Sequence, residues 1–163
     1  TGDSSMQQVS MNANPVAKPT WADPHPQKDR VYVANNGSDE IIEVDTKSWK
    51  ILRRFQTGNG TAPYNLEVTS DGRHVIASYK GTGSTGIWSI EDGKEVTEIA
   101  NSRGVSHGVS TTPDSNYAFI SVEGKGGEPG SVDIINMDNM QRVDVVEVGK
   151  QAGGIIYWKT ESN

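Results

Sequence analysis

Three side chains in this sequence are candidate metal ligands because of their places in the chain: His107, Asp23 and Glu67. An imidazole nitrogen suits copper and other transition metals, whereas carboxylate oxygens also suit calcium. Two neighbouring carboxylates can in addition work as a general acid and a general base. The alternative is that all three are ordinary polar residues of a wet channel, with His107 held by a hydrogen bond. We favour this second interpretation, so the sequence predicts no cofactor and no catalytic residue, and a transition-metal or calcium site at His107, Asp23 and Glu67 is kept as a candidate that depends on the fold.

The elements that would position these side chains come from a repeat. Three stretches can be laid over one another with offsets of 44 and 43 residues: 19–33, 63–77 and 106–120. Asp23 and Glu67 fall at the same position of the repeat, where the third copy has Ser110. The positions equivalent to His107 hold other residue types: Thr20, Tyr64 and Gly153. A ring of histidines is therefore not built in this chain.

Each copy contains four short runs of apolar and β-branched residues, separated by turns rich in Gly, Asn, Asp and Ser. Such runs, spaced about eight to twelve residues apart, predict the strands of an antiparallel meander. No window has the periodicity of a helix. Four strands in a repeat of 43 to 47 residues are typical of one β-propeller blade. The predicted fold is all-β, with three four-stranded blades at about these residues: 19–58, 62–102 and 105–149.

The two ends of the chain extend beyond three blades. Residues 152–159 have the pattern of the first strand of a further blade, with Gly154 aligned to Gly108. Residues 1–18 are predicted to be a tail or linker, which can include an outer strand of a preceding blade at 6–11. Because a propeller ring needs about four to eight blades, three blades leave an incomplete ring with two bare faces. Another chain, a second copy or residues outside this sequence would complete it, and the alternative is an open arc.

Two regions are predicted to bind a protein partner. Tyr157 and Trp158 lie near the end of the incomplete blade, where a large aromatic side chain needs a cover. Gly126 and Glu128 lie in the longest turn, residues 124–130, which resembles a phosphate loop only in composition. Because the turn lacks the Gly-Lys-Ser/Thr ending and a following helix, a widened hairpin loop is the better interpretation. Loops of this kind often carry binding surfaces.

Charge and composition narrow the possible partners. The chain has 163 residues, a formal net charge of −6 and a pI near 5.0. Because it has no basic run, nucleic acid is not expected as a partner. No apolar stretch reaches membrane-spanning length. Cysteine is absent, which rules out disulfides and thiol chemistry and is compatible with export from a bacterial cell.

The first copy of the repeat resembles a known family. Residues 31–39, followed by 42–45, are similar to the YVTN-type β-propeller repeat, and residues 106–114 resemble the family's first strand and turn. The resemblance covers about residues 19–160, although Gln27 and Lys28 stand where the family usually has Asp-Gly. It implies an exported bacterial or archaeal protein, periplasmic or extracellular, such as a surface-layer or periplasmic binding protein. Related propellers hold cofactors in nitrous oxide reductase and cytochrome cd1 nitrite reductase.

Three functional interpretations follow from these patterns. The first, which we favour, is a non-enzymatic propeller segment that serves as an interaction and assembly scaffold for protein partners in an exported protein. The second is a redox or metal-site propeller, nitrous oxide reductase-like or cytochrome cd1-like, in which missing blades complete a site to which His107 and the channel carboxylates contribute. The third is a lactonase-type propeller hydrolase with a channel metal. Because the fold alone does not choose among them, the arrangement of the candidate residues must decide.

Overall fold

A computed structural model describes residues 16–160 and consists of three four-stranded antiparallel sheets. Blade 1 contains β1 (Pro19–Pro24), β2 (Arg30–Asn35), β3 (Glu40–Asp45) and β4 (Ile51–Gln56). Blade 2 contains β5 (Pro63–Val68), β6 (His74–Tyr79), β7 (Ser84–Ser89) and β8 (Lys94–Ala100). Blade 3 contains β9 (Val105–Thr111), β10 (Tyr117–Glu123), β11 (Gly130–Asn136) and β12 (Gln141–Val148). The predicted all-β fold is confirmed, and no helix long and apolar enough to cross a membrane occurs in this part of the chain.

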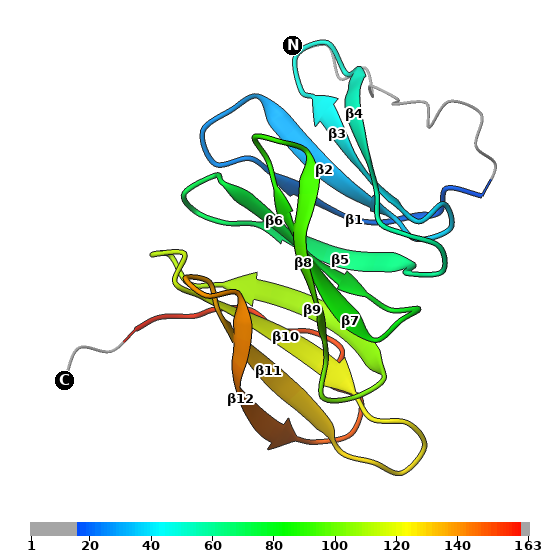
Figure 1. The fold of residues 1–163 in the computed structure, drawn as a ribbon, viewed down its shortest axis with the longest axis vertical. Helices are drawn as coiled ribbons and strands as arrows, with labels where there is room; N and C mark the ends of the chain where they lie inside the picture. The colour runs from blue at the N-terminus through cyan, green and yellow to red at the C-terminus, as the bar shows by residue number, and fades with distance from the viewer. Residues whose placement is uncertain (1–15, 161–163) are drawn as a thin grey trace, which may run out of the picture.

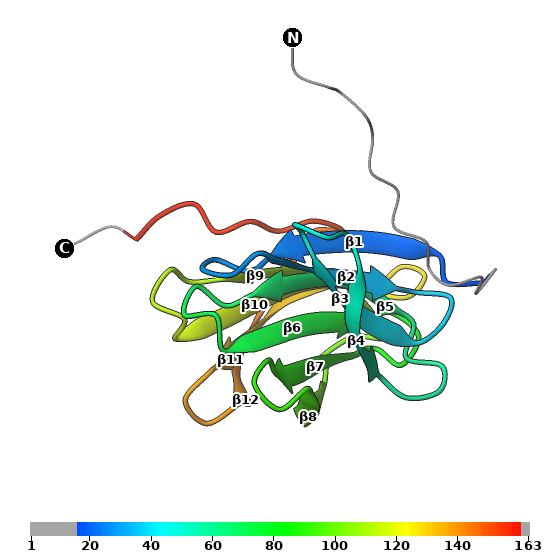
Figure 2. The same ribbon diagram turned by 90° about the horizontal axis from the view of Figure 1, so that it is seen from above.

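Within each blade every strand pairs with the next one along the chain, as a meander requires. The three blades follow one another as an arc, with blade 2 in the middle (Figure 1). The first strands of the blades, β1, β5 and β9, are neighbours and form the inner side of the arc, and β8 and β12 lie at the opposite side (Figure 2). Blades 1 and 3 each keep one face on which no blade of the described chain packs, so the ring is incomplete, as predicted.

The hydrophobic core lies between the blades. Between blades 1 and 2, the rings of Phe55 and Trp88 stack with centroids 5.5 Å apart and planes 7° apart. Between blades 2 and 3, Ile76 and Ile87 pack against one buried cluster of blade 3: Val109, Ala118, Ile120, Val122, Ile135 and Met137. Blade 2 therefore buries apolar side chains on both faces, which explains the nearly continuous apolar run of β6.

The turns between first and second strands repeat the same local bonds. In blade 2, Gly72 has a φ of +70° and its N–H donates to the carbonyl of Thr69 at 2.7 Å. In blade 3, Ser115 has a φ of +61° and donates to the carbonyl of Thr112 at 2.8 Å. Glycine adopts this conformation more readily than serine does, yet both turns close in the same way. The repeat in the sequence is thus a repeat in backbone geometry.

The last residues of the predicted tail make backbone hydrogen bonds with blade 1. Residues 16–18 lie against the turn after β2, where the N–H of Asn36 donates to the carbonyl of Lys18 at 3.1 Å and that of Gly37 to Ala17 at 2.9 Å. The side chain of Ala17 is buried. The strand predicted at 6–11 lies outside the described residues.

The predicted strand at 152–159 is wrong as stated. Residues 151–160 belong to no sheet of the described chain, because no second strand is present for them to pair with. The segment instead runs, drawn out, along the inner side of the arc (Figure 2). It is joined to blade 3 by the N–H of Tyr157, which donates to Ser110 Oγ at 2.8 Å.

Candidate functional site

A cavity of about 340 Å³, here called the inner-strand cavity, lies where the first strands of the three blades meet. Its walls come from β1, β5, β9 and residues 153–156. The lining includes all three predicted metal ligands: Asp23, Glu67 and His107. They meet there because each lies on the first strand of its blade, and the first strands share the inner side of the arc.

Asp23 and Glu67 connect neighbouring blades. A carboxylate oxygen of Asp23 accepts the N–H of Val68 in the next blade at 2.9 Å. Glu67 does the same one blade further on, accepting the N–H of Thr111 at 2.9 Å and its hydroxyl at 2.6 Å. We call these bonds the inter-blade tethers. They give both carboxylates a structural role, since each satisfies an N–H on the free edge of the following first strand.

Burial raises the pKa of Asp23 above its ordinary value of 3.8. The N–H of Val68 opposes this shift because it stabilises the charged form, and the nearby negative charge of Glu67 reinforces it. The negative charge on Asp23 therefore lowers the free energy of unfolding, relative to a neutral side chain at this position.

Asp23→Asn is expected to raise the free energy of unfolding at pH 7, because asparagine keeps an oxygen for the N–H of Val68 and removes the buried charge. A folded-state pKa above the unfolded value makes the wild type lose stability as the pH rises through it. The advantage of the variant should therefore shrink as the pH falls through the raised folded-state pKa, and it should be gone below the unfolded-state value of 3.8. Urea unfolding across this range measures it, and a variant less stable than the wild type at pH 7 speaks against this reading of Asp23.

His107 is 9% exposed and lies at the start of β9. Its ring meets that of Tyr64 edge-on, with centroids 5.0 Å apart. Its Nε2 lies 3.4 Å from a carboxylate oxygen of Glu123, which is ion-pair distance without an aligned hydrogen bond. Burial and the ammonium of Lys80 lower the pKa of His107, and Glu123 only partly offsets them. The imidazole is therefore neutral at pH 7.

The structure brings the three predicted ligands to one cavity but not to one cluster. Among residues 16–160, no group of three or more His, Asp or Glu side chains is arranged to hold a metal ion. Asp23 and Glu67 are engaged in the inter-blade tethers, and His107 contacts Glu123. The metal and cofactor assignments therefore stay predictions.

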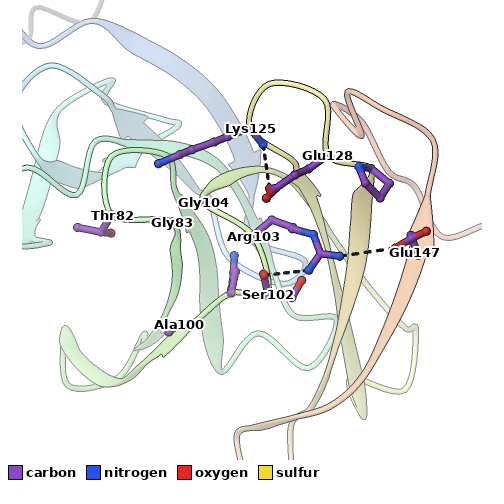
Figure 3. Close-up of a pocket in the computed structure, with 11 residues that line it drawn as sticks. Thr82, Gly83, Ala100, Ser102, Arg103, Gly104, Lys125, Glu128 and Glu147 are labelled. Carbon is purple, nitrogen blue, oxygen red and sulfur yellow. Dashed lines mark hydrogen bonds and ion pairs between the residues drawn. The ribbon is translucent and has the colours of Figure 1, made fainter.

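The loop that carries Gly126 and Glu128 lines a second cavity of about 600 Å³ at the junction of blades 2 and 3 (Figure 3). The N–H of Lys125 donates to the Glu128 carboxylate at 3.4 Å, and its side chain crosses close to Gly104. Gly126 has a φ of +66° and open space around its α-carbon. The loop joins two strands, so it is the widened hairpin that the sequence predicts.

Sequence reasoning missed Arg103, which lines this cavity from the loop before β9. In Figure 3 its guanidinium points between Ser102 and Glu147. It donates to the carbonyl of Ser102 at 3.1 Å and lies 3.7 Å from a carboxylate oxygen of Glu147 on β12. The cavity wall thus carries a positive and a negative side chain, Arg103 and Glu147, which come from segments far apart in the sequence.

Buried charges that join the outer strands were also missed. Glu43 on β3 is 5% exposed and contacts Arg53 of β4 and Arg30 of β2. Asp133 on β11 is fully buried and lies 3.3 Å from Arg142 of β12. The signal in the sequence is the pairing of opposite charges across strands, which becomes visible only when the register, such as Glu43 opposite Arg53, is known.

The two predicted partner-binding aromatics differ in their surroundings. Trp158 is 84% exposed and Ile156 is 86% exposed, whereas Tyr157 is half-buried. The indole of Trp158 therefore has no cover within the described chain. Its exposure is what a partner-binding role requires, although that role stays a prediction.

Comparisons with known proteins identify the fold. No protein-family model and no curated protein matches the chain. Among solved structures, hydrazine synthase of Kuenenia stuttgartiensis is similar over 80% of this chain, with a TM-score of 0.74 and 20% identity. The WD40 repeats of RRP9 match 78% with a TM-score of 0.69 and 14% identity. A putative 6-phosphogluconolactonase from Bacteroides uniformis matches 81% with a TM-score of 0.67 and 15% identity.

This chain corresponds to only part of each of those proteins. The matched regions make up 37%, 38% and 42% of the three chains. At such low identities the likeness shows the fold alone. The described residues are therefore an incomplete β-propeller, built of blades like those of WD40 and other propeller proteins.

Proposed function

We propose that this chain is a non-enzymatic propeller segment that acts as an assembly scaffold. Its open blade faces bind further blades, which another protein chain or a second copy supplies. The location that belongs to this proposal is periplasmic or extracellular, as in the exported proteins whose repeats the sequence resembles.

One pair of equivalent positions carries the proposal. In blade 2 the pair is Ile76 and Ile87, which are fully buried against blade 3. In blade 3 the same positions hold Phe119 and Ile134, which lie opposite each other in the register and are only half-buried. Because complete burial of such a side chain is worth about 1.5 to 3 kcal/mol, a following blade would stabilise this face.

The outermost strand of blade 3 adds a second exposed region. Its valines are accessible to solvent at 52%, 38% and 47%: Val143, Val145 and Val146. Because β12 is an edge strand, one row of its backbone N–H and C=O groups also lacks a neighbouring strand. An apolar edge beside an apolar open face is a surface suited to association with protein.

Phe119→Asp is expected to abolish this association, because it places a charge among the apolar side chains of the open face. The matched control is Val96→Asp, which changes an apolar side chain, 49% exposed, on the outermost strand of blade 2. In sedimentation velocity, the wild type and the control should run heavier than the 17.6 kDa chain and Phe119→Asp as the single chain. Far-UV circular dichroism shows whether both variants keep their strands. Equal behaviour of the two variants would reject the proposal.

A further inference from the structure

We infer that residues 152–158 bind an antiparallel β-strand of the partner, in a defined register, and so become the first strand of a fourth blade. The inference rests on the proposed function in one respect, because it takes the partner to be a blade-forming protein. It adds the binding segment, the register and the sequence pattern of the partner strand.

A third inter-blade tether joins residues 152–158 to blade 3. Ser110 is the repeat equivalent of Glu67, and its hydroxyl accepts the N–H of Tyr157 at 2.8 Å. Val68, Thr111 and Tyr157 are therefore equivalent donors, spaced 43 and 46 residues apart. Although residues 151–160 form no strand, Tyr157 already occupies the position that Val68 and Thr111 hold in complete blades.

Successive N–H groups of a drawn-out chain point to opposite edges, so those of Ile156 and Trp158 point away from the edge that is tethered through Tyr157. In β9, the residue before the tether donor is Ser110, which lies opposite Phe119 of the second strand. Because Ile156 corresponds to Ser110, its edge is the one on which a second strand would pair.

In blades 2 and 3, a serine of the second strand accepts one N–H of the first strand. In blade 2 the N–H of Asn65 donates to Ser78 Oγ at 3.1 Å, and in blade 3 the N–H of Gly108 donates to Ser121 Oγ at 2.8 Å. Both serines lie on the second strand and are buried. The equivalent donor in the fourth blade is Gly154. The partner strand should therefore present a hydroxyl to Gly154.

The residues around these serines complete the pattern. Three small or apolar residues precede each serine: Val75, Ile76 and Ala77 in β6, and Ala118, Phe119 and Ile120 in β10. A strand of this type adds main-chain hydrogen bonds to the edge of residues 152–158 and covers the exposed Ile156. The partner strand we expect consists of three small or apolar residues followed by Ser or Thr.

The test uses the chain's own second and third strands as the probe, as a synthetic hairpin of residues 112–137. Because the sequence has no cysteine, an Ile156→Cys chain and a hairpin with Phe119→Cys carry one thiol each. The register predicts that these two thiols face each other at a distance that a disulfide can bridge. The control hairpin carries Ile120→Cys, one residue away, whose side chain points to the other face.

In a glutathione buffer, the Phe119→Cys hairpin should form the mixed disulfide at least about tenfold faster than the Ile120→Cys hairpin. Adding Ser121→Ala to the Phe119→Cys hairpin should slow it by about fivefold, because Gly154 loses its acceptor. Equal rates for the two hairpins, a faster reaction of the Ile120→Cys hairpin, or no disulfide at all would overturn the inference.

The outcome is separate from that of the proposed function. A register-specific disulfide together with unchanged association of Phe119→Asp would leave the strand pairing standing and reject the scaffold. Loss of association in Phe119→Asp without any register-specific disulfide would leave the scaffold standing and reject the strand pairing.

Discussion

Replacing Trp88 with alanine is expected to lower the free energy of unfolding by about 3 to 5 kcal/mol. The indole is 4% exposed and stacks on Phe55 across the junction of blades 1 and 2. Its Nε1 also donates to the hydroxyl of Tyr79 at 2.7 Å. The substitution therefore leaves a cavity between the blades and removes a donor from a buried hydroxyl. Urea denaturation monitored by circular dichroism measures the loss.

Trp158→Ala is the matched control for this experiment. The same side chain is removed, but Trp158 is 84% exposed, so its loss should change the stability by less than about 0.5 kcal/mol. Similar losses in the two variants would show that the blades are not held together by the Phe55 and Trp88 contact.

Gly86→Ala is expected to cost about 2 to 3 kcal/mol, although it adds only one methyl group. An added Cβ would lie 2.1 Å from the Tyr79 hydroxyl and 2.6 Å from a carboxylate oxygen of Glu95. These two groups are joined by a hydrogen bond of 2.7 Å, and burial raises the pKa of both Tyr79 and Glu95. The methyl group must displace a paired, partly buried network, so the strain cannot be relieved by a single free side chain.

Gly127→Ala tests whether the effect comes from the close approach. Gly127 has open space around it in the loop before β11, and its substitution should stay within about 0.5 kcal/mol of the wild type. Thermal unfolding of both variants gives the comparison. If Gly86→Ala unfolds at the wild-type temperature, the packing around Tyr79 leaves room for a methyl group and the expected cost is wrong.

The blades could be predicted from the sequence because their determinants are local. The predicted blade at 62–102 contains strands from Pro63 to Ala100, and the one at 105–149 contains strands from Val105 to Val148. Short apolar runs and turn residues specify these strands without knowledge of distant contacts. The repeat then aligned Asp23 with Glu67 correctly, as the two equivalent tethers show.

The roles of those aligned residues could not be predicted in the same way. A carboxylate on a first strand has the same sequence signature whether it binds a cation or accepts an N–H of the next blade. The distinction depends on how far apart neighbouring first strands lie, and only the packing of the blades sets that distance. The ion pairs of Glu43 and Asp133 were missed for a related reason, since they depend on strand register.

At residues 152–159 the sequence predicted the position of the segment correctly but not its secondary structure. Its sequence matches a first strand, and Tyr157 makes the tether that a first strand makes. Strand formation nevertheless requires a second strand, and no other part of the described chain supplies one. A sequence pattern can therefore predict a strand correctly in position and still not predict whether its pairing partner is present.

The molecular mass of the purified native protein tests the scaffold most directly. Light scattering coupled to size exclusion should give a species heavier than 17.6 kDa, because the open face at Phe119 and Ile134 takes up a further blade. A stable, soluble species of 17.6 kDa that binds no dye specific for exposed apolar surface would contradict it.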